Sequence, residues 1–345
     1  MESLLELPAD EMAEAGELPA DLADYYRGKA SRFDARAELE QASRLGVRLI
    51  DFEDPEYPDL LKSIPDFPLL LYIRGELRKD ALTVAFVGSR RPTYYGRRMT
   101  QALAAEAVAG GLTVVSGLAR GIDTEAHKAA LGARDPSRAP TWAVLGSGLG
   151  RIYPSENEAL SRDIVEAGGC LISEYPLLCA PLKANFPRRN RIIAGLSWGS
   201  VVVEGEVNSG SLITAKFALE YGRQVFGVPG PADSSLSDAP HKMIKSGAKL
   251  AAKIEDIFDE LPPGCRPMMP KAIPEGQQGV ASPAATLSIE QTKILQCLKS
   301  EAWSLEQVGN ALGIDLPRLS GILCDMELQD LVVSLPGQRY AKKRN

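Results

Sequence analysis

The feature that most constrains the fold is a repeated alternation between short apolar runs and Ala-rich helical segments. The apolar runs cover residues 83–87, 112–115, 142–145, 170–172, 201–203 and 225–228. Helical spacing marks residues 98–109, 124–131, 156–167 and 212–221. Continuous apolar strands alternating with helices predict a parallel sheet that is covered on both faces. We therefore expect an α/β protein with an extended Rossmann-like parallel sheet core.

The remaining sequence divides around this core. Acidic, Ala- and Leu-rich sequence predicts a small helical N-terminal segment, and a Pro- and Gly-rich stretch predicts a linker. The core itself opens with an extended, Pro-punctuated lead-in at 51–75. The predicted units are the N-terminal segment 1–50, the core 51–261, the linker 262–285 and a C-terminal domain 286–345.

The C-terminal domain is predicted to be a winged helix. Helical spacing covers 288–300, 305–312 and 316–328, and an apolar stretch then leads to a turn at Pro336-Gly337. Three helices followed by a hairpin are typical of this fold. The domain is almost neutral, which favours a protein contact or a weak duplex contact over strong DNA binding.

Composition argues against several classes of protein. The five cysteines form no C-x-x-C pair, and only His127 and His241 could supplement them, so a zinc site is not expected. The N-terminus lacks a signal-peptide pattern, and no run of 18 apolar residues occurs. We expect a cytoplasmic protein with reduced thiols, no membrane span, no metal and no cofactor.

The net charge of −6 taken alone argues against binding to nucleic acid, since phosphate contacts require Lys and Arg. A local basic cleft can override this whole-chain average, so the positions of the cations matter more.

Glycine-rich loops follow several of the predicted strands. They are Gly88-Ser89-Arg90-Arg91, Ser116 to Asp123, Gly146-Ser147-Gly148 and Gly205 to Ser211. In a parallel sheet these strand ends meet at one edge, where backbone N–H groups and helix N-termini favour anions. Arg90 and Arg120 add positive charge there. The loops together predict a phosphate-binding floor, although each alone could be only a tight turn.

Two familiar nucleotide-binding patterns are missing from these loops. No G-x-x-x-x-G-K-[ST] sequence occurs, which argues against a P-loop ATPase. Gly146 to Gly150 does not complete G-x-G-x-x-G, and the second strand ends in Ser116 where an NAD enzyme has an acidic ribose ligand.

The segment from Lys183 to Gly195 concentrates positive charge around one aromatic ring. It contains Lys183, Arg188, Arg189 and Arg191 near Phe186, with no acidic residue between them. Guanidinium groups bind phosphates, and an aromatic ring can stack on an unpaired base. Ordinary structural roles remain open, above all for Phe186 as core and Arg191 as a helix anchor.

Asp123 and His127 are four residues apart at a predicted helix start. A metal or acid–base pair is conceivable, but a structural role is favoured, with Asp123 capping the helix and His127 bonded to a neighbour.

These motifs, in this order, resemble the DprA/Smf family of DNA-processing proteins. The matching sequences include Val87-Gly88-Ser89-Arg90, Ser116 to Asp123 with Ala126-His127, Tyr153-Pro154, Ser173-Glu174-Tyr175-Pro176, Phe186 to Leu196, Ser209-Gly210-Ser211 and Val228-Pro229-Gly230. The resemblance covers about residues 55–260.

The resemblance implies a non-enzymatic protein that binds single-stranded DNA with little sequence preference. It also implies a homodimer that protects incoming DNA and helps load the recombinase RecA during natural transformation. The residues expected at the DNA site, from the loops and from the family motifs, are Gly88, Ser89, Arg90, Gly117, Arg120, Lys183, Phe186, Arg188, Arg189, Arg191, Gly210 and Ser211.

Two other functions remain open from the sequence. A nucleotide-processing hydrolase similar to the Lonely-guy phosphoribohydrolases is the main alternative, with Glu204 and Glu206 beside the last glycine loop. The third is an interaction scaffold that uses the core only to dimerise.

Overall fold

The structure is a computed structural model. It describes residues 33–133, 139–207, 209–261, 289–298, 302–328, 331–335, 337 and 339–342. The chain separates into two compact units, Met1–Ala272 and Ile273–Asn345, which are described one at a time. The expected linker and most of the expected N-terminal segment lie outside the described residues, so the domain boundaries remain predictions.

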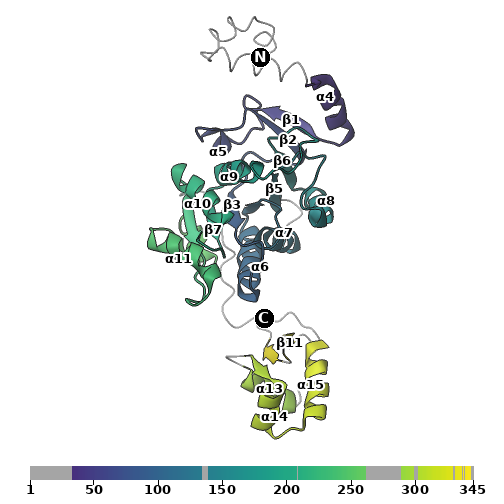
Figure 1. Ribbon diagram of the computed structural model, residues 1–345, viewed down its shortest axis with the longest axis vertical. Helices are drawn as coiled ribbons and strands as arrows, with labels where there is room; N and C mark the ends of the chain where they lie inside the picture. Colours follow the sequence, from purple (N-terminus) through teal and green to yellow (C-terminus); the bar gives the residue numbers. More distant parts are fainter. Residues whose placement is uncertain are drawn as a thin grey trace, which may run out of the picture. The chain divides into compact units, whose positions relative to one another are not determined.

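The first unit is built on one mixed sheet, whose described strands follow the order β1-β2-β6-β5-β4-β3-β7-β8-β9 (Figure 1). Pairing is parallel from β6 through to β9 and antiparallel between β1, β2 and β6. The strands are β1 Arg48–Asp51, β2 Leu70–Gly75, β3 Thr83–Val87, β4 Thr113–Ser116, β5 Thr141–Leu145, β6 Cys170–Ser173, β7 Gly199–Val202, β8 Gln224–Gly227 and β9 Lys249–Leu250.

The expected parallel Rossmann-like core is therefore confirmed, with an addition at one edge. The segment expected as an extended lead-in contains β2, which pairs with β6 through Tyr72 and Ser173. It also contains the short helix α5 Asp59–Lys62.

Helices cover both faces of the sheet. Successive residues of a strand point to opposite sides, so an apolar strand has two faces that must be buried. Ala85 and Val87 of β3 pack in the cluster that contains Ile192, while Val84 and Phe86 pack in a second cluster around α6 and α7. Figure 1 shows α6 and α7 side by side, and α9 beside α10. The remaining helices are α4 Ala35–Arg44, α6 Tyr94–Ala109, α7 Ile122–Gly132, α8 Glu158–Glu166, α9 Asn185–Gly195, α10 Gly210–Glu220, α11 Asp238–Lys245 and α12 Glu255–Phe258.

The strand order reverses direction at β3. The chain runs from β3 outward through β4, β5 and β6, then returns to place β7 on the other side of β3. Ligands of open α/β sheets bind outside the carboxyl ends of the strands at such a reversal. The loops after β3 and β7 are thus the first place to look for a site.

The second unit is a winged helix, as expected from the sequence. A sheet of order β10-β12-β11 packs beside three helices. Ser304 and Gln307 form a capping box at the start of α14. Buried Ile294, Val308 and Leu323 lie in its core. The elements are α13 Ile289–Cys297, β10 Trp303–Ser304, α14 Leu305–Leu312, α15 Leu316–Leu328, β11 Val332–Leu335 and β12 Arg339–Lys342.

No helix within the described residues is both long enough and apolar enough to cross a membrane.

Candidate nucleic-acid interface

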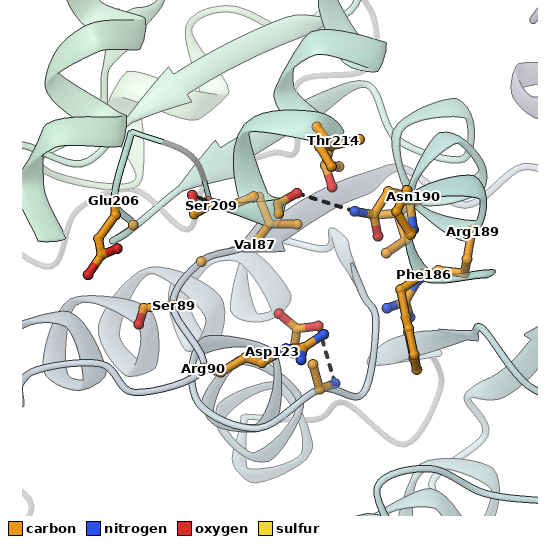
Figure 2. Close-up of a pocket in the computed structure, with 18 of the residues that line it drawn as sticks. Val87, Ser89, Arg90, Asp123, Phe186, Arg189, Asn190, Glu206, Ser209 and Thr214 are labelled. Carbon is orange, nitrogen blue, oxygen red and sulfur yellow. Dashed lines mark hydrogen bonds between the residues drawn. The ribbon is translucent and has the colours of Figure 1, made fainter. Parts of the chain in front are cut away.

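A cavity of about 1020 Å³ opens at the reversal of strand order (Figure 2). Its walls come from the loop after β3, the start of α9, the loop after β7 and the first turn of α10. The main lining residues are Gly88, Ser89, Arg90, Arg91, Tyr153, Lys183, Phe186, Arg189, Asn190, Glu206, Ser209, Gly210, Ser211 and Thr214. Three of the four glycine loops expected from the sequence, those after β3, β4 and β7, therefore contribute to one site, whereas Gly146-Ser147-Gly148 does not line it.

The loop after β3 carries two exposed arginines, Arg90 and Arg91, on a tightly held backbone. The Ser89 hydroxyl accepts a hydrogen bond from the Arg91 N–H at 3.0 Å. Gly121, with φ +77°, supports the loop from below, since a Cβ there would lie 2.3 Å from the Ser89 carbonyl oxygen. Glycine is thus required where the start of α7 meets this loop.

The first turn of α10 forms another wall of the cavity. Gly210, Ser211 and Thr214 line it, and the first backbone N–H groups of a helix have no partner within the helix. The Asn190 side-chain amide donates to the Gly210 carbonyl at 3.3 Å and so ties α9 to this turn. The Ser209 and Ser211 hydroxyls lie 2.6 Å apart. Such a turn favours an anion such as phosphate.

Phe186 lies in the first turn of α9, half-buried, between two other cavity residues. The Arg90 guanidinium carbon is 5.7 Å from the centroid of its ring. The Tyr153 ring centroid is 5.6 Å away on a plane tilted by 47°. The Asn185 amide donates to the Gly146 carbonyl at 3.1 Å, which fixes where the helix begins. An aromatic ring and a cation are thereby held together at the cavity wall.

Arg189 has a different position from the one that its sequence neighbours suggest. It is only 4 % exposed, and its guanidinium donates to the carbonyls of Gly117, at 2.6 Å, and Val144. It lies at the floor of the cavity, which it helps to line, and its guanidinium is bonded within the fold. A direct contact of Arg189 with DNA stays a prediction.

Burial also changes the titration of Arg189 and of Asp123. Desolvation lowers the pKa of Arg189 to about 10, with Asp123 acting in the opposite sense. Desolvation raises the pKa of the Asp123 carboxyl, which Arg189 and the N–H groups of Ala119 and Gly117 oppose. Asp123 accepts from those N–H groups at 3.2 and 3.0 Å, so it holds the loop after β4 rather than capping its own helix.

Arg191 is likewise committed within the fold. Its side chain is 13 % exposed and pairs with Glu174 and with Asp66, the latter at 3.5 Å. The alternative that Arg191 anchors its helix fits this geometry better than a DNA contact. Arg191 lies inside α9, which begins at Asn185.

Three further expected site residues lie outside the cavity lining. Gly117 is buried against Arg189, and Arg188 is exposed. Arg120 is exposed and pairs with Glu156 at 2.5 Å. The residues that the structure does bring together are Gly88, Ser89, Arg90, Lys183, Phe186, Gly210 and Ser211, with Arg189 below them.

Comparisons with known proteins agree with this architecture. Residues 48–262 match the model of the family described as DNA recombination-mediator protein A. The chain belongs to the DNA recombination-mediator protein A family, the DprA/Smf family. Residues 279–338 match the DprA winged helix domain.

Individual DprA/Smf proteins are similar over most of the chain. Protein Smf of Escherichia coli is 40 % identical over 306 residues, covering 87 % of this chain and 78 % of the relative. The DprA protein of Bacillus subtilis is 43 % identical over 219 residues, covering 63 % of this chain and 72 % of the relative.

Solved DprA structures share the fold. The Streptococcus pneumoniae DprA crystal structure aligns with a TM-score of 0.64 at 36 % identity, covering 74 % of this chain and 88 % of that one. A Helicobacter pylori DprA structure, described for its single-stranded DNA binding mode, aligns with a TM-score of 0.54 at 28 % identity. It covers 61 % of this chain and 94 % of its own.

The lining of this DprA/Smf cavity is positively charged, whereas the chain as a whole is negative. Four cationic side chains and two carboxylates line it. Arg189 and Asp123 are buried beside each other, which leaves Arg90, Arg91 and Lys183 against Glu206. The cavity surface is therefore positive even though the chain has a net charge of −6.

Sequence reasoning left several cavity residues out of the expected site. They are Arg91, Tyr153, Asn190, Glu206, Ser209 and Thr214. Arg91, Glu206 and Ser209 lie within glycine loops that the sequence had already marked, so loop membership was an available signal. Identifying Asn190 would have required knowing which face of α9 lines the cavity. Identifying Tyr153 would have required knowing that the loop after β5 reaches Phe186.

His127 is buried and has a structural role, as favoured from the sequence. Its Nδ1 lies 2.7 Å from the Thr141 hydroxyl, which itself donates to the Val114 carbonyl. Thr141 must therefore accept from His127, which places the proton on Nδ1. Burial, reinforced by Arg189, lowers the pKa of His127 to about 3, so the imidazole is neutral near pH 7. Among the described residues no cluster of acidic, Cys and His side chains could hold a metal ion.

Glu204 is one of the two carboxylates that left a hydrolase function open in the sequence, and in the structure it has a structural role. It is buried and accepts from the Thr93 N–H at 2.8 Å and from the Thr93 hydroxyl at 2.5 Å. Thr93 caps α6, so Glu204 holds the start of that helix. Glu206 alone of the two faces the cavity.

Proposed function

We propose that this protein binds single-stranded DNA in the cavity between the loops after β3 and β7, without catalysing a reaction. The observation that carries the proposal is Arg90 held 5.7 Å above Phe186, beside the first turn of α10. Arg90 offers a positive charge to a phosphate, and Phe186 offers a ring on which a base can stack. The single-stranded DNA binding mode described for the Helicobacter pylori relative supports it.

Each wall has a separate part in the proposal. Phosphates contact Arg90, Lys183 and the backbone N–H groups at Ser89 and Gly210, while one base stacks on Phe186. Phosphate contacts carry no sequence information directly, and every base has a face that can stack. The binding is therefore expected to show little sequence preference.

The same proposal extends to the role of the bound strand. The protein protects incoming single strands in the cytoplasm and helps load RecA on them during natural transformation, acting as a homodimer. The family description as a recombination mediator supports the RecA step. The dimer and transformation rest on the resemblance to the DprA/Smf family.

Fluorescence anisotropy of a labelled oligo-dT tests the proposal directly. The protein is titrated at two salt concentrations, with unlabelled duplex as competitor. We expect tight binding that salt weakens, because phosphate contacts release counterions, and that duplex does not displace. A lack of binding at low salt would contradict the proposal.

A second assay separates this proposal from the hydrolase alternative. The protein is incubated with nucleoside monophosphates and the mixture is analysed for free base. We expect none, since Glu204 is bound to Thr93 and only Glu206 of the two carboxylates faces the cavity. Released base would favour the phosphoribohydrolase reading.

A further inference from the structure

Tyr153 continues the aromatic surface of the cavity beyond Phe186. It comes from the loop after β5, far from α9 in sequence, and its ring centroid lies 5.6 Å from that of Phe186. It lines the cavity and is 39 % exposed. Packing within the fold thus accounts for only part of the Tyr153 surface.

A cation lies near the same loop, outside the cavity lining. The Arg120 guanidinium pairs at 2.5 Å with Glu156, three residues after Tyr153. Glu156 also raises the pKa of Arg120, and Tyr153 adds a smaller contribution. Tyr153 therefore has Phe186 as a neighbour inside the cavity and Arg120 as a neighbour outside its lining. A strand that leaves the cavity over Tyr153 would reach the exposed Arg120 next.

Arg90 and Tyr153 are both neighbours of Phe186. The Arg90 guanidinium carbon lies 5.7 Å from the centroid of the Phe186 ring, and the Tyr153 ring centroid lies 5.6 Å from it. Aromatic rings of this kind are the surfaces on which successive bases of a single strand stack. Two adjacent rings at the cavity wall therefore offer contacts for two neighbouring bases.

We infer that Tyr153 is a second base-stacking residue, which receives the nucleotide next to the one on Phe186 in the direction of Arg120. The inference rests on the proposed single-strand binding. It adds a nucleotide subsite formed by the loop after β5, and it gives the exposed Arg120 a phosphate at the exit of the cavity.

The test compares three variants with the unmodified protein. Tyr153→Ala removes the ring, Tyr153→Phe keeps it, and Tyr94→Ala removes a tyrosine that is 61 % exposed and lies outside the cavity lining. Anisotropy is measured with the shortest oligo-dT that retains full affinity, so that the strand has one register. The same oligonucleotide is then made with a single abasic nucleotide at each position in turn.

We expect Tyr153→Ala to weaken binding about five- to twentyfold, the lower range for loss of one stacked base. Tyr153→Phe and Tyr94→Ala should bind like the unmodified protein. Base removal should weaken the unmodified protein at two adjacent positions. In Tyr153→Ala only the position assigned to Phe186 should remain sensitive, and in Phe186→Ala only the position assigned to Tyr153.

Some outcomes would overturn the inference while leaving the proposed function intact. One is strong oligo-dT binding with an abasic profile that Tyr153→Ala leaves unchanged. Another is equal loss in Tyr153→Ala and Tyr153→Phe with lowered melting temperatures, which would mean a structural role. If the unmodified protein does not bind oligo-dT, the proposed function fails and the inference fails with it.

Discussion

The Arg90 guanidinium lies 5.7 Å from the centre of the Phe186 ring and joins the loop after β3 to the first turn of α9. A cation above an aromatic face gains about 0.5–1 kcal/mol at an exposed site. The contact holds two parts of the proposed DNA site together before any strand is bound. Phosphate and base contacts can then form on a surface that is already arranged.

Replacing Phe186 and replacing Arg90 should change oligo-dT binding in different ways. Phe186→Ala should lower affinity for oligo-dT by about 1–3 kcal/mol without changing its dependence on salt, because stacking releases no counterions. Arg90→Ala should lower affinity and also reduce the slope of log K against log salt by about 0.7, as expected for one lost phosphate contact on a single strand. Anisotropy titrations over a series of salt concentrations measure both. An unchanged slope in Arg90→Ala would contradict its assignment to phosphate.

Arg189 should matter for stability. Arg189→Met leaves the buried carbonyls of Gly117 and Val144 without this donor. A buried polar group left without its hydrogen-bond partner costs about 1–3 kcal/mol in free energy of unfolding. Urea unfolding measures this cost. Arg188→Met, on the exposed neighbour, is the control and should stay within about 0.5 kcal/mol of the unmodified protein. Equal stability of the two variants would show that Arg189 is not held as described.

His127 should make the folded protein sensitive to acid. Its folded pKa of about 3 lies below the ordinary 6.5, so the unfolded chain binds a proton that the folded chain does not. The stability it contributes is full above pH 6.5 and is lost as the pH falls toward 3, with a slope of up to about 1.4 kcal/mol per pH unit.

His127→Asn isolates that effect, since its amide can still donate to Thr141. The raised pKa of Asp123 acts in the opposite sense, but Asp123 is present in both proteins and largely cancels in the comparison. Urea unfolding across this pH range should show that the variant loses less stability in acid. Parallel pH profiles for the two proteins would rule out His127 as the cause.

Gly121 should be needed for the shape of the DNA site. Its φ is +77°, and a Cβ would lie 2.3 Å from the Ser89 carbonyl oxygen and 2.7 Å from the Arg90 carbonyl carbon. Gly121→Ala should therefore lower the melting temperature and weaken oligo-dT binding, because the loop carrying Arg90 must move. Gly132→Ala is the matched control, with nothing within 4 Å of the added Cβ. It should keep DNA affinity and gain stability by up to about 1 kcal/mol. Unchanged affinity in Gly121→Ala would contradict the claim that Gly121 shapes the loop carrying Arg90.

The parallel core could be predicted from the sequence because its strands are buried on both faces. The run expected at 83–87 is β3, and the glycines after β3 and β7 do converge at the reversal of strand order. Strand β2 was expected only as part of an extended lead-in, because prolines precede it and its partner strand β6 is distant in sequence. The local sequence pattern of β2 does not show which distant strand it pairs with.

The arginines of α9 show where sequence reasoning on the site stopped. In the sequence, Arg188 and Arg189 were equivalent candidates for the DNA site, while Arg191 was already open to a role as a helix anchor. Once 185–195 is a helix, the buried positions 185, 189, 192 and 193 share one face, so the spacing could have identified Arg189 as buried. The partners of Arg191, Asp66 and Glu174, come from elsewhere in the chain and no local pattern indicates them.

Charge reversal at the cavity is the most direct test of the proposed DNA site. Lys183→Glu and Arg90→Glu are compared with Lys128→Glu, an exposed lysine of α7 outside the cavity lining, by oligo-dT anisotropy at low salt. We predict that both cavity variants lose binding with unchanged melting curves, while Lys128→Glu binds like the unmodified protein. Native melting curves with undiminished oligo-dT affinity in Lys183→Glu and Arg90→Glu would contradict the assignment of this cavity to single-stranded DNA.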